Sequence, residues 1–339
     1  MKKHPLKKPY VSVLLIGGIL LAAALLLFLA LRADRRVDSV QVEHGGEQLT
    51  RQPVTSIEHD GEWHKLRKDV QTVLLIGTDS LQDTETDPDL DLYYNYDQAD
   101  FLALVVFDDA ERTCTFIHIN RDTMCSVPWL TVNGMLGGED IEQIALAHTY
   151  GSGGEDSCEN TCHAVQNLLF GLPVTSYACV TMDAVPVVND MIGGVTLTLD
   201  EDLTDLDPSY TKGSRITLRG NAALSFVRAR MSVGDGLNLS RMGRQRQYIA
   251  AFIDAFRASA GNDDALLVRI VEKLDKKLLL NLGMNQIRSL SDKIREYEIL
   301  PPVIPDGENR QGEVFMEYYV DEASLWETVR DMFCEDPSA

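Results

Sequence analysis

The longest apolar segment of the chain is Val11–Leu31, whose 21 residues carry no charged side chain. As a helix this segment would extend about 30 Å, which matches the hydrocarbon thickness of a bilayer. A cleaved signal peptide is the alternative, but its apolar region usually has about 7–15 residues and leads to a small-residue cleavage site. Here the run is longer and continues into Leu31-Arg32-Ala33-Asp34. The pattern therefore predicts a retained, single-pass transmembrane helix.

The residues on either side of this segment predict its orientation. Four lysines precede it and three arginines follow it, a weak positive-inside bias that places residues 1–10 in the cytoplasm as a short tail. We therefore expect a protein of the cell membrane whose main domain is extracytoplasmic. Residues 37–68 are polar and lack clear periodicity, so residues 32–70 are interpreted as a stalk between membrane and domain.

Short apolar runs then alternate with amphipathic segments. Phe101–Phe107 and Thr113–Asn120 are separated by an acidic turn and predict a β-hairpin. Further strands are expected at 72–76, 177–182 and 195–199, and helices at 156–170, 183–192, 220–230 and 241–260. This alternation indicates an α/β fold, with a three-layer α/β/α domain and a central mixed sheet over residues 71–260.

Residues 261–339 contain no recognisable motif. Their apolar patterns predict helices at Leu266–Leu282, Met284–Tyr297 and Leu325–Phe333. We interpret this part of the chain as a C-terminal helical extension that packs on the domain.

Charge is distributed unevenly along the chain. The formal net charge is −21, and residues 1–40 contribute +5 from seven basic and two acidic side chains, so residues 41–339 sum to −26. Such an acidic body repels nucleic acid and anionic lipid headgroups. Nucleic acid is therefore excluded as a partner, and any phosphate bound by the domain must be held by local arginines or by a metal ion.

Arginines nevertheless collect in one part of this acidic domain. The window from 228 to 246 contains a single acidic residue, no lysine, and Arg228, Arg230, Arg241, Arg244 and Arg246. Guanidinium groups suit the bidentate binding of phosphate oxygens, which makes the window a candidate phosphate site. A solvated helix face with salt bridges to the acidic surface is the alternative interpretation.

Two more groups of polar residues flank the predicted strands. Arg121 and Asp122 lie where a strand ends, a common position for catalytic side chains in α/β sheets, although a strand-terminal ion pair would look the same. Asp79 follows the first strand and Asp100 precedes the second. If these strands are neighbours, the two carboxylates could converge on one Mg²⁺; otherwise each is a turn or cap residue.

The six cysteines allow two interpretations. An even number fits disulfides in an oxidising compartment, with 15 complete pairings to choose from, whereas six free, buried thiols are the alternative. Cys158 and Cys162 would lie one helical turn apart, which is poor geometry for a mutual bond. None of the usual zinc spacings occurs. The six positions are Cys114, Cys125, Cys158, Cys162, Cys179 and Cys334.

These segments resemble, in order, the motifs of the LytR-CpsA-Psr family, whose members attach glycopolymers to peptidoglycan. No single motif is decisive, but the ordered set is specific, and it runs from about residue 72 to residue 258. The N-terminal apolar segment also fits this family. The matching segments are Leu74-Leu75-Ile76-Gly77-Thr78-Asp79-Ser80, Gln98-Ala99-Asp100-Phe101, Ile119-Asn120-Arg121-Asp122-Thr123, Ala147-His148-Thr149-Tyr150-Gly151, Leu218–Arg230 and Ser240–Gln245.

The resemblance implies transfer of a glycopolymer phosphate from a polyprenyl-pyrophosphate carrier to a muramic acid hydroxyl of peptidoglycan. It implies Mg²⁺, or Mn²⁺ as the alternative ion, on Asp79 and Asp100, and pyrophosphatase activity would be compatible with the same site. Catalytic roles are expected for Arg121, Asp122, Arg228 and Arg230. The residues expected to bind the substrate phosphates are Arg121, Arg228, Arg230, Arg241, Arg244 and Gln245.

This sequence departs from the family pattern at three positions and leaves other functions open. Gln98 and Leu81 stand where arginines are frequent, and Ala99 replaces a serine. A polyprenyl pyrophosphate phosphatase that uses water as acceptor, and a non-catalytic lipid-binding or regulatory envelope protein, are the alternatives. Tyr248 and Phe252, with Phe256 at the same spacing, could line a lipid slot or form ordinary core.

Overall fold

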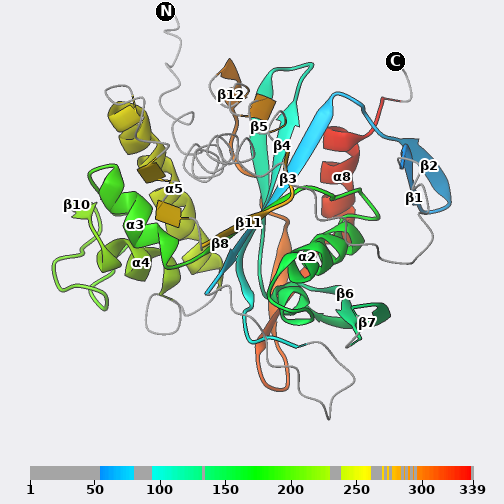
Figure 1. The fold of residues 1–339 in the computed structure, drawn as a ribbon, viewed down its shortest axis with the longest axis horizontal. Helices are drawn as coiled ribbons and strands as arrows, with labels where there is room; N and C mark the ends of the chain where they lie inside the picture. The colour runs from blue at the N-terminus through cyan, green and yellow to red at the C-terminus, as the bar shows by residue number, and fades with distance from the viewer. Residues whose placement is uncertain are drawn as a thin grey trace, which may run out of the picture.

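The computed structural model (Figure 1) does not describe the predicted membrane segment, Val11–Leu31. No helix in the described part of the chain is both long and apolar enough to cross a bilayer. The described residues are 54–79, 94–131, 134–229, 238–260, 269–270, 273–274, 277–283, 286, 289–290, 293 and 296–336.

A six-stranded mixed sheet forms the centre of the fold, in the order β11-β8-β3-β4-β5-β12. Strand β3 runs parallel to β8 and β5 parallel to β12, whereas β4 is antiparallel to both β3 and β5, and β11 to β8. The mixed sheet and the β4–β5 hairpin confirm two sequence predictions. The strands are β3 (Val70–Thr78), β4 (Ala99–Asp108), β5 (Thr113–Ile119), β8 (Tyr177–Thr181), β11 (Leu278–Leu280) and β12 (Glu298–Ile299).

Helices cover both faces of this sheet (Figure 1), which confirms the predicted three-layer α/β/α arrangement. On one face Val73 and Leu75 belong to a core shared with α3 (Ala184–Met191), α4 (Asn221–Arg228) and α5 (Asn238–Ala260). On the other face Leu74 and Ile76 belong to a core shared with α2 (Glu155–Leu168) and α8 (Glu322–Phe333). Because successive strand residues point to opposite faces, the apolar run Val73–Ile76 of β3 contributes to both cores.

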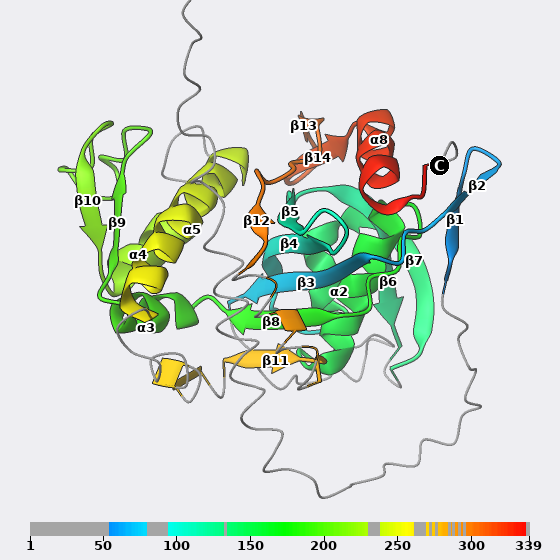
Figure 2. The ribbon, with the colours of Figure 1, turned by 90° about the horizontal axis from the view of Figure 1, so that it is seen from above.

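Smaller elements surround the central sheet (Figure 2). Three antiparallel pairs are formed by β6 with β7, β9 with β10, and β13 with β14. A short 3₁₀ helix, η2 (Ile144–Thr149), follows β7 and packs on α2. The strands of these pairs are β6 (Met124–Leu130), β7 (Leu136–Gln143), β9 (Val195–Thr198), β10 (Arg215–Leu218), β13 (Gly307–Gln311) and β14 (Met316–Val320).

The stalk prediction for residues 32–70 is wrong over the part that the structure describes. Strands β1 (Ser56–His59) and β2 (Glu62–Lys65) form a hairpin (Figure 2). Leu66 bridges to Cys334, the residue after α8. The turn is Asp60-Gly61, with φ of 52° and 82°. An Asp-Gly pair favours this two-residue hairpin turn, so the segment is part of the domain rather than a spacer.

The prediction of a purely helical C-terminal extension, residues 261–339, is also wrong. The chain from 278 onward supplies two strands of the central sheet, β11 and β12, and the β13–β14 hairpin. Strand β11, Leu278–Leu280, lies inside the helix that the apolar pattern predicts up to Leu282. A short apolar run cannot be distinguished from a buried helical segment by periodicity alone. The C-terminal helix prediction is confirmed by α8, where Asp321 Oδ1 accepts a hydrogen bond from Ser324 N at 3.0 Å.

All six cysteines lie in the described part of the chain, and all are buried, free thiols. Of the two interpretations that the sequence left open, the structure therefore shows the second. Cys125, Cys158, Cys162 and Cys179 belong to the core between the sheet and α2.

Candidate active site

The ends of β3 and β4 bring two predicted metal ligands to one edge of the sheet. Thr78 pairs with Ala99 after a register shift at Gly77 and Thr78. Asp79 is the next residue after β3, and Asp100 follows Ala99 within β4. The two strands are therefore neighbours, as the metal-site prediction requires, while metal binding itself stays a prediction.

Asp100 lies at the centre of an arginine cluster. Its Oδ1 accepts hydrogen bonds from Arg121 and, at 3.3 Å, from Arg241 Nη1, and its backbone carbonyl accepts from Arg241 Nη2 at 3.2 Å. The other arm of the Arg121 guanidinium donates to Gln98 Oε1. The side chains of Arg121 and Asp100 are each 12% exposed, and that of Arg241 is 5% exposed. The structure thus brings together charges from β4, the end of β5 and α5 in a poorly hydrated place.

The turn after β5 determines where Arg121 and Asp122 lie. Thr123 N donates to the Asn120 carbonyl at 3.0 Å, and Asn120 Oδ1 accepts from Asp122 N, also at 3.0 Å. Such a side-chain bond to the backbone two residues on is typical of an Asx turn. The Asp122 carboxylate is 3.6 Å from Arg121 Nε. Asp122 therefore lies where it can orient Arg121.

Residues far along the chain support this turn from behind. Asp122 O accepts from Tyr318 N of β14 at 2.8 Å, and Thr123 forms a parallel bridge with Tyr318. From α5, Asn238 Nδ2 donates to Asn120 Oδ1 at 2.6 Å. The β14 contact involves a segment that the sequence assigned to a motif-free extension, so sequence reasoning missed this part of the site.

Arg228 pairs with the other predicted metal ligand at the surface. Its Nη2 lies 2.7 Å from Asp79 Oδ2, and the two side chains are 52% and 43% exposed. An exposed ion pair contributes little to stability, so these two side chains can exchange partners readily when an anion or a cation arrives. Arg230, predicted to be catalytic, lies outside the described residues.

Arg244 and Gln245 lie beneath this surface and hold the end of α4. Arg244, 2% exposed, donates to the carbonyls of Phe226 (3.3 Å) and Ala229, and its Nη1 is 3.4 Å from Glu201 Oε1. Gln245 Nε2 donates to the Val227 carbonyl at 3.2 Å. These bonds satisfy backbone carbonyls that a helix end leaves without partners. Phosphate binding by both residues stays a prediction, beside this observed structural contact.

Replacing Arg244 by methionine is expected to lower the free energy of unfolding by about 3 kcal/mol, because buried carbonyls lose charged donors and stay desolvated. Urea unfolding of the full-length chain measures this. Gln247→Met is the matched control, since Gln247 on the same helix makes one exposed bond to the Thr198 carbonyl at 2.8 Å; its loss should stay below about 1 kcal/mol. Wild-type stability in Arg244→Met would contradict the structural role.

Arg246 and His118 extend the cluster on its inner side. Burial, helped by the charges of Arg246 and Arg241, lowers the pKa of His118 to about 3. Burial also lowers the pKa of Arg246. Among the described residues no group accepts a hydrogen bond from Arg246 Nη1, which is buried. A buried guanidinium nitrogen without an acceptor is costly unless an anion binds there, so Arg246 joins the candidate phosphate ligands.

The depressed pKa of His118 predicts a pH-dependent stability. Below the unfolded pKa of about 6.5 the unfolded chain takes up a proton that the folded chain does not, so stability falls as the pH falls. Between pH 7 and pH 5 the loss from this group should be about 2 kcal/mol. We expect His118→Gln to reduce the difference between urea unfolding curves at pH 7 and pH 5 by that amount. An unchanged difference would show that His118 is protonated in the folded chain.

An apolar pocket opens beside the charged cluster. It contains about 830 Å³ of space, part of it open to solvent, and is lined by β3, β4, β8, α3, α4 and α5. Several lining residues are next to cluster residues in sequence: Phe101 beside Asp100, Val227 beside Arg228, and Gln245 beside Arg244. The charged cluster and the pocket are therefore built on the same elements.

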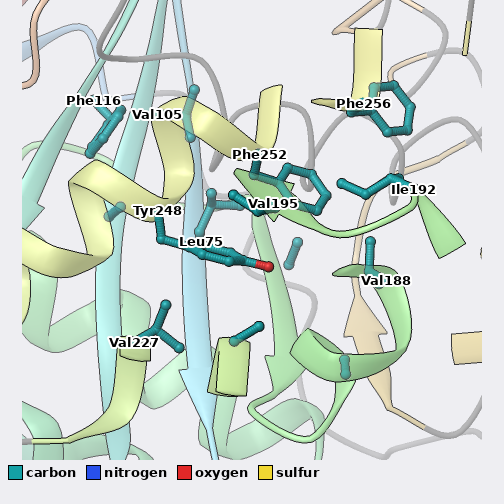
Figure 3. Packing of buried hydrophobic residues seen from close by; sticks show 14 of the residues in the cluster. Leu75, Val105, Phe116, Val188, Ile192, Val195, Val227, Tyr248, Phe252 and Phe256 are labelled. Atoms are coloured by element: carbon teal, nitrogen blue, oxygen red, sulfur yellow. The ribbon is translucent and has the colours of Figure 1, made fainter. Parts of the chain in front are cut away.

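The aromatic stripe of α5 contributes to this pocket. Figure 3 shows Tyr248 and Phe252 on the helix, facing Leu75 of the sheet and Val188 of α3. All four line the pocket, whereas Phe256, the third member of the predicted stripe, lies in the core outside the lining. The Tyr248 hydroxyl donates to Asn189 Oδ1 at 3.1 Å. The stripe is thus core and pocket wall at once.

Asp79 and Asp100 form a donor set that fits Mg²⁺. This ion binds through one or two carboxylates and keeps water or substrate phosphate oxygens as its remaining ligands. Both lie at the same end of the β3–β4 pair, where the Asp79 side chain is 43% exposed and that of Asp100 is 12% exposed. Both carboxylates are paired with guanidinium groups, so a bound cation would compete with these arginines for the carboxylate oxygens. The released arginines could then bind a phosphate group.

Comparison with known proteins identifies relatives of this chain. The model of the LytR_cpsA_psr family matches residues 33–327. A relative in Bacillus cereus (strain AH820), polyisoprenyl-teichoic acid–peptidoglycan teichoic acid transferase TagU, is 25% identical over 260 residues, which are 75% of each chain. TagT of Bacillus subtilis (strain 168), with the corresponding name, is 26% identical over 227 residues, 64% of this chain and 62% of its own.

Solved structures show the same fold. A structure described as TagT bound to LIIa-WTA has a TM-score of 0.58 at 20% identity, covering 78% of this chain and 90% of its own. The crystal structure of B. subtilis TagT has a TM-score of 0.56 at 22% identity, with the same coverage of both chains.

Proposed function

Because this chain belongs to the LytR_cpsA_psr family, we propose that it is a phosphotransferase that moves a glycopolymer phosphate from a polyprenyl-pyrophosphate carrier to a hydroxyl of peptidoglycan. Relatives that match between 64% and 75% of the chain are named polyisoprenyl-teichoic acid–peptidoglycan teichoic acid transferases. Sequence identity of about one quarter supports the reaction class and does not specify the glycopolymer.

One observation carries the proposal: a buried arginine cluster adjoins an apolar pocket on shared elements. A polyprenyl pyrophosphate has a long apolar chain and a head with two to three negative charges. The pocket lining at Phe101 and Gln245 continues directly into Asp100 and Arg244, so one molecule can place its chain in the pocket and its head among the guanidinium groups. The rest of the domain is acidic, so it offers few positive charges to an anionic pyrophosphate head.

The residues of the cluster supply binding and charge neutralisation. Arg121, Arg241 and Arg246 contact the phosphates from the inner side, and Arg228 from the surface. An acceptor hydroxyl oxygen attacks the phosphorus attached to the glycopolymer, the bond to the bridging oxygen breaks, the polyprenyl phosphate leaves with the electron pair, and the hydroxyl proton is released to water. Phosphoryl transfer depends mainly on positioning and on such stabilisation of developing charge.

Asp79 and Asp100 are proposed to hold Mg²⁺, with Mn²⁺ as the alternative ion. When bound, the ion neutralises charge on phosphate oxygens. Asp122 keeps Arg121 oriented through the 3.6 Å contact with its Nε. Gln98, which stands where relatives often have arginine, provides a neutral acceptor for Arg121 instead of a further positive charge, so this chain relies more heavily on its remaining arginines.

The apolar segment Val11–Leu31 is proposed to anchor the protein in the cell membrane, with the described domain on the extracytoplasmic side. Its length matches a bilayer. This placement would keep the pocket close to a carrier lipid that is itself anchored in the membrane.

The test uses the full-length chain in detergent with a polyprenyl-pyrophosphate-linked glycopolymer, Mg²⁺ and soluble peptidoglycan chains. We expect release of polyprenyl phosphate and a glycopolymer joined to peptidoglycan by a phosphodiester, and both should stop when a chelator removes the metal. Mass spectrometry of the peptidoglycan product measures transfer.

Two other outcomes would redirect the assignment. Cleavage that yields free glycopolymer phosphate, with or without peptidoglycan, would identify a phosphatase that uses water as acceptor. Binding of the lipid without cleavage would identify a non-catalytic lipid-binding protein, in which Gln98 has weakened the site.

A further inference from the structure

A second cluster of reactive side chains lies behind the active site, between the sheet and α2. It consists of His148 on η2, Cys158 on α2 and Cys179 on β8. The imidazole nitrogen and the two sulfur atoms all lie within 4.8 Å of one another, and all three residues are 0% exposed. The three residues are separated in the sequence, so they do not form a recognisable zinc-binding motif.

The hydrogen bonds of His148 aim its free lone pair at the sulfur atoms. His148 Nδ1 lies 2.7 Å from the Asp97 carbonyl, which can only accept, so Nδ1 carries the proton. Nε2 is then the unprotonated nitrogen, and it faces Cys179 Sγ at 4.0 Å. Metal-binding histidines usually have this arrangement, in which the second ring nitrogen donates to a carbonyl or carboxylate.

We propose that His148, Cys158 and Cys179 form a buried structural metal site for Zn²⁺. Tetrahedral zinc, with bonds of about 2.3 Å to sulfur and 2.0 Å to nitrogen, requires sulfur atoms about 3.8 Å apart and sulfur–nitrogen distances of about 3.5 Å, so the cluster must contract by at most about 1.3 Å. Two thiolates and a neutral imidazole leave the zinc site with no net charge, which suits complete burial. Thr78 Oγ1, 4.0 Å from Cys179 Sγ, is an oxygen that could serve as a fourth ligand.

A disulfide between Cys158 and Cys179 would explain the sulfur atoms but not the histidine. A disulfide does not require an imidazole whose lone pair points at one of its sulfur atoms. A metal ion uses all three groups, and thiolate with imidazole is a preferred zinc donor set.

The site would connect four parts of the fold near the catalytic residues. It joins η2, α2 and β8, and through Asp97 it reaches the segment that enters β4. Asn95 fixes the same segment by donating to the carbonyls of His148 (2.8 Å) and Gly151 (2.9 Å). Metal binding would therefore stabilise the start of β4, where Gln98 and Asp100 lie, without contacting the substrate.

Because the site is fully buried, the metal must enter as the chain folds. The test expresses the full-length chain in medium containing Zn²⁺ or Co²⁺ and purifies it in detergent with a reductant. We expect one metal ion per chain by mass spectrometry, and a thiolate-to-cobalt charge-transfer band for the Co²⁺ form. Unfolding should release the ion, and the zinc form should melt on the order of 5 °C above metal-free protein.

Cys158→Ala and Cys179→Ala are expected to lose the metal and the cobalt band. Cys114→Ala is the matched control, because Cys114 is an equally buried thiol on β5, outside the cluster, and it should keep both. Near-ultraviolet circular dichroism shows whether each variant has folded. Reduced, folded wild-type protein that contains no metal after expression with Zn²⁺ or Co²⁺ would overturn the proposal, and so would a Cys158–Cys179 disulfide found by peptide mapping, or a control that loses the metal equally.

Discussion

Replacing Arg121 by alanine is expected to reduce the rate of polyprenyl pyrophosphate cleavage by about 100- to 1,000-fold, the usual effect of removing one preorganised donor to a developing charge. The guanidinium is 12% exposed, and its two arms reach Asp100 and Gln98. Initial rates at saturating substrate measure the effect, which should appear in kcat.

Two further variants separate charge from geometry. Arg121→Lys keeps the charge but has no fork to bridge Asp100 and Gln98, so it should recover only part of the lost rate. Arg112→Ala is the matched control on the same hairpin, because Arg112 forms an exposed ion pair with Glu296 at 2.8 Å; its rate should equal that of the wild type. If Arg121→Ala retained a third of the wild-type rate, the cluster would not be the phosphate site.

Strands β3, β4, β5 and β8 of the central sheet could be predicted because their apolar runs are regular in sequence. The apolar runs that became β4 and β5 are interrupted only by an acidic turn, and this pattern admits a hairpin and little else. The helices after Gly220 and before Gly171 were also predicted to within a few residues. Glycine marks where these helices begin or end, so the local signal and the tertiary structure agree there.

The predictions for the β1–β2 hairpin and for Leu278–Leu280 are wrong for two different physical reasons. The β1–β2 hairpin has a local sequence signal, the turn pair Asp60-Gly61, within a segment that its polar composition favoured as a stalk. By contrast, Leu278–Leu280 has no local feature that distinguishes strand from helix, since its state depends on pairing with β8 along the sheet edge. Tertiary context of this kind cannot be obtained from periodicity.

Prediction of the site divides in the same way. Strand-end positions indicated Asp79, Asp100, Arg121 and Asp122, and the structure places them at one end of the sheet or in the turn after β5. Which arginines face a ligand could not be predicted, because that depends on helix rotation. Arg244 is committed to the α4 carbonyls, while Arg246, which belongs to the predicted arginine window but not to the set of expected phosphate-binding residues, has a buried nitrogen without an acceptor among the described residues.

Filling the apolar pocket is expected to block long carrier lipids while leaving the chemistry intact. Val185 on α3 is half-buried and lines the pocket, so Val185→Trp should fill part of it. Displacing only two carbon groups of the lipid from an apolar wall costs about 1.6 kcal/mol, which lowers kcat/KM about 15-fold. A pyrophosphate with a single isoprene unit should be cleaved within about twofold of the wild-type rate, because its short chain leaves the pocket largely empty.

Val187→Trp provides the matched control for this prediction. Val187 lies two residues further along α3, is also half-buried, and packs on the same core, but it does not line the pocket. Both variants should lose a similar amount of stability, measured by thermal unfolding, because each adds an indole to the same helix. Only Val185→Trp should discriminate against the long lipid. Equal discrimination by both variants would mean that helix displacement, and not occupation of the pocket, controls the reaction; no discrimination by either would place the polyprenyl chain elsewhere on the molecule.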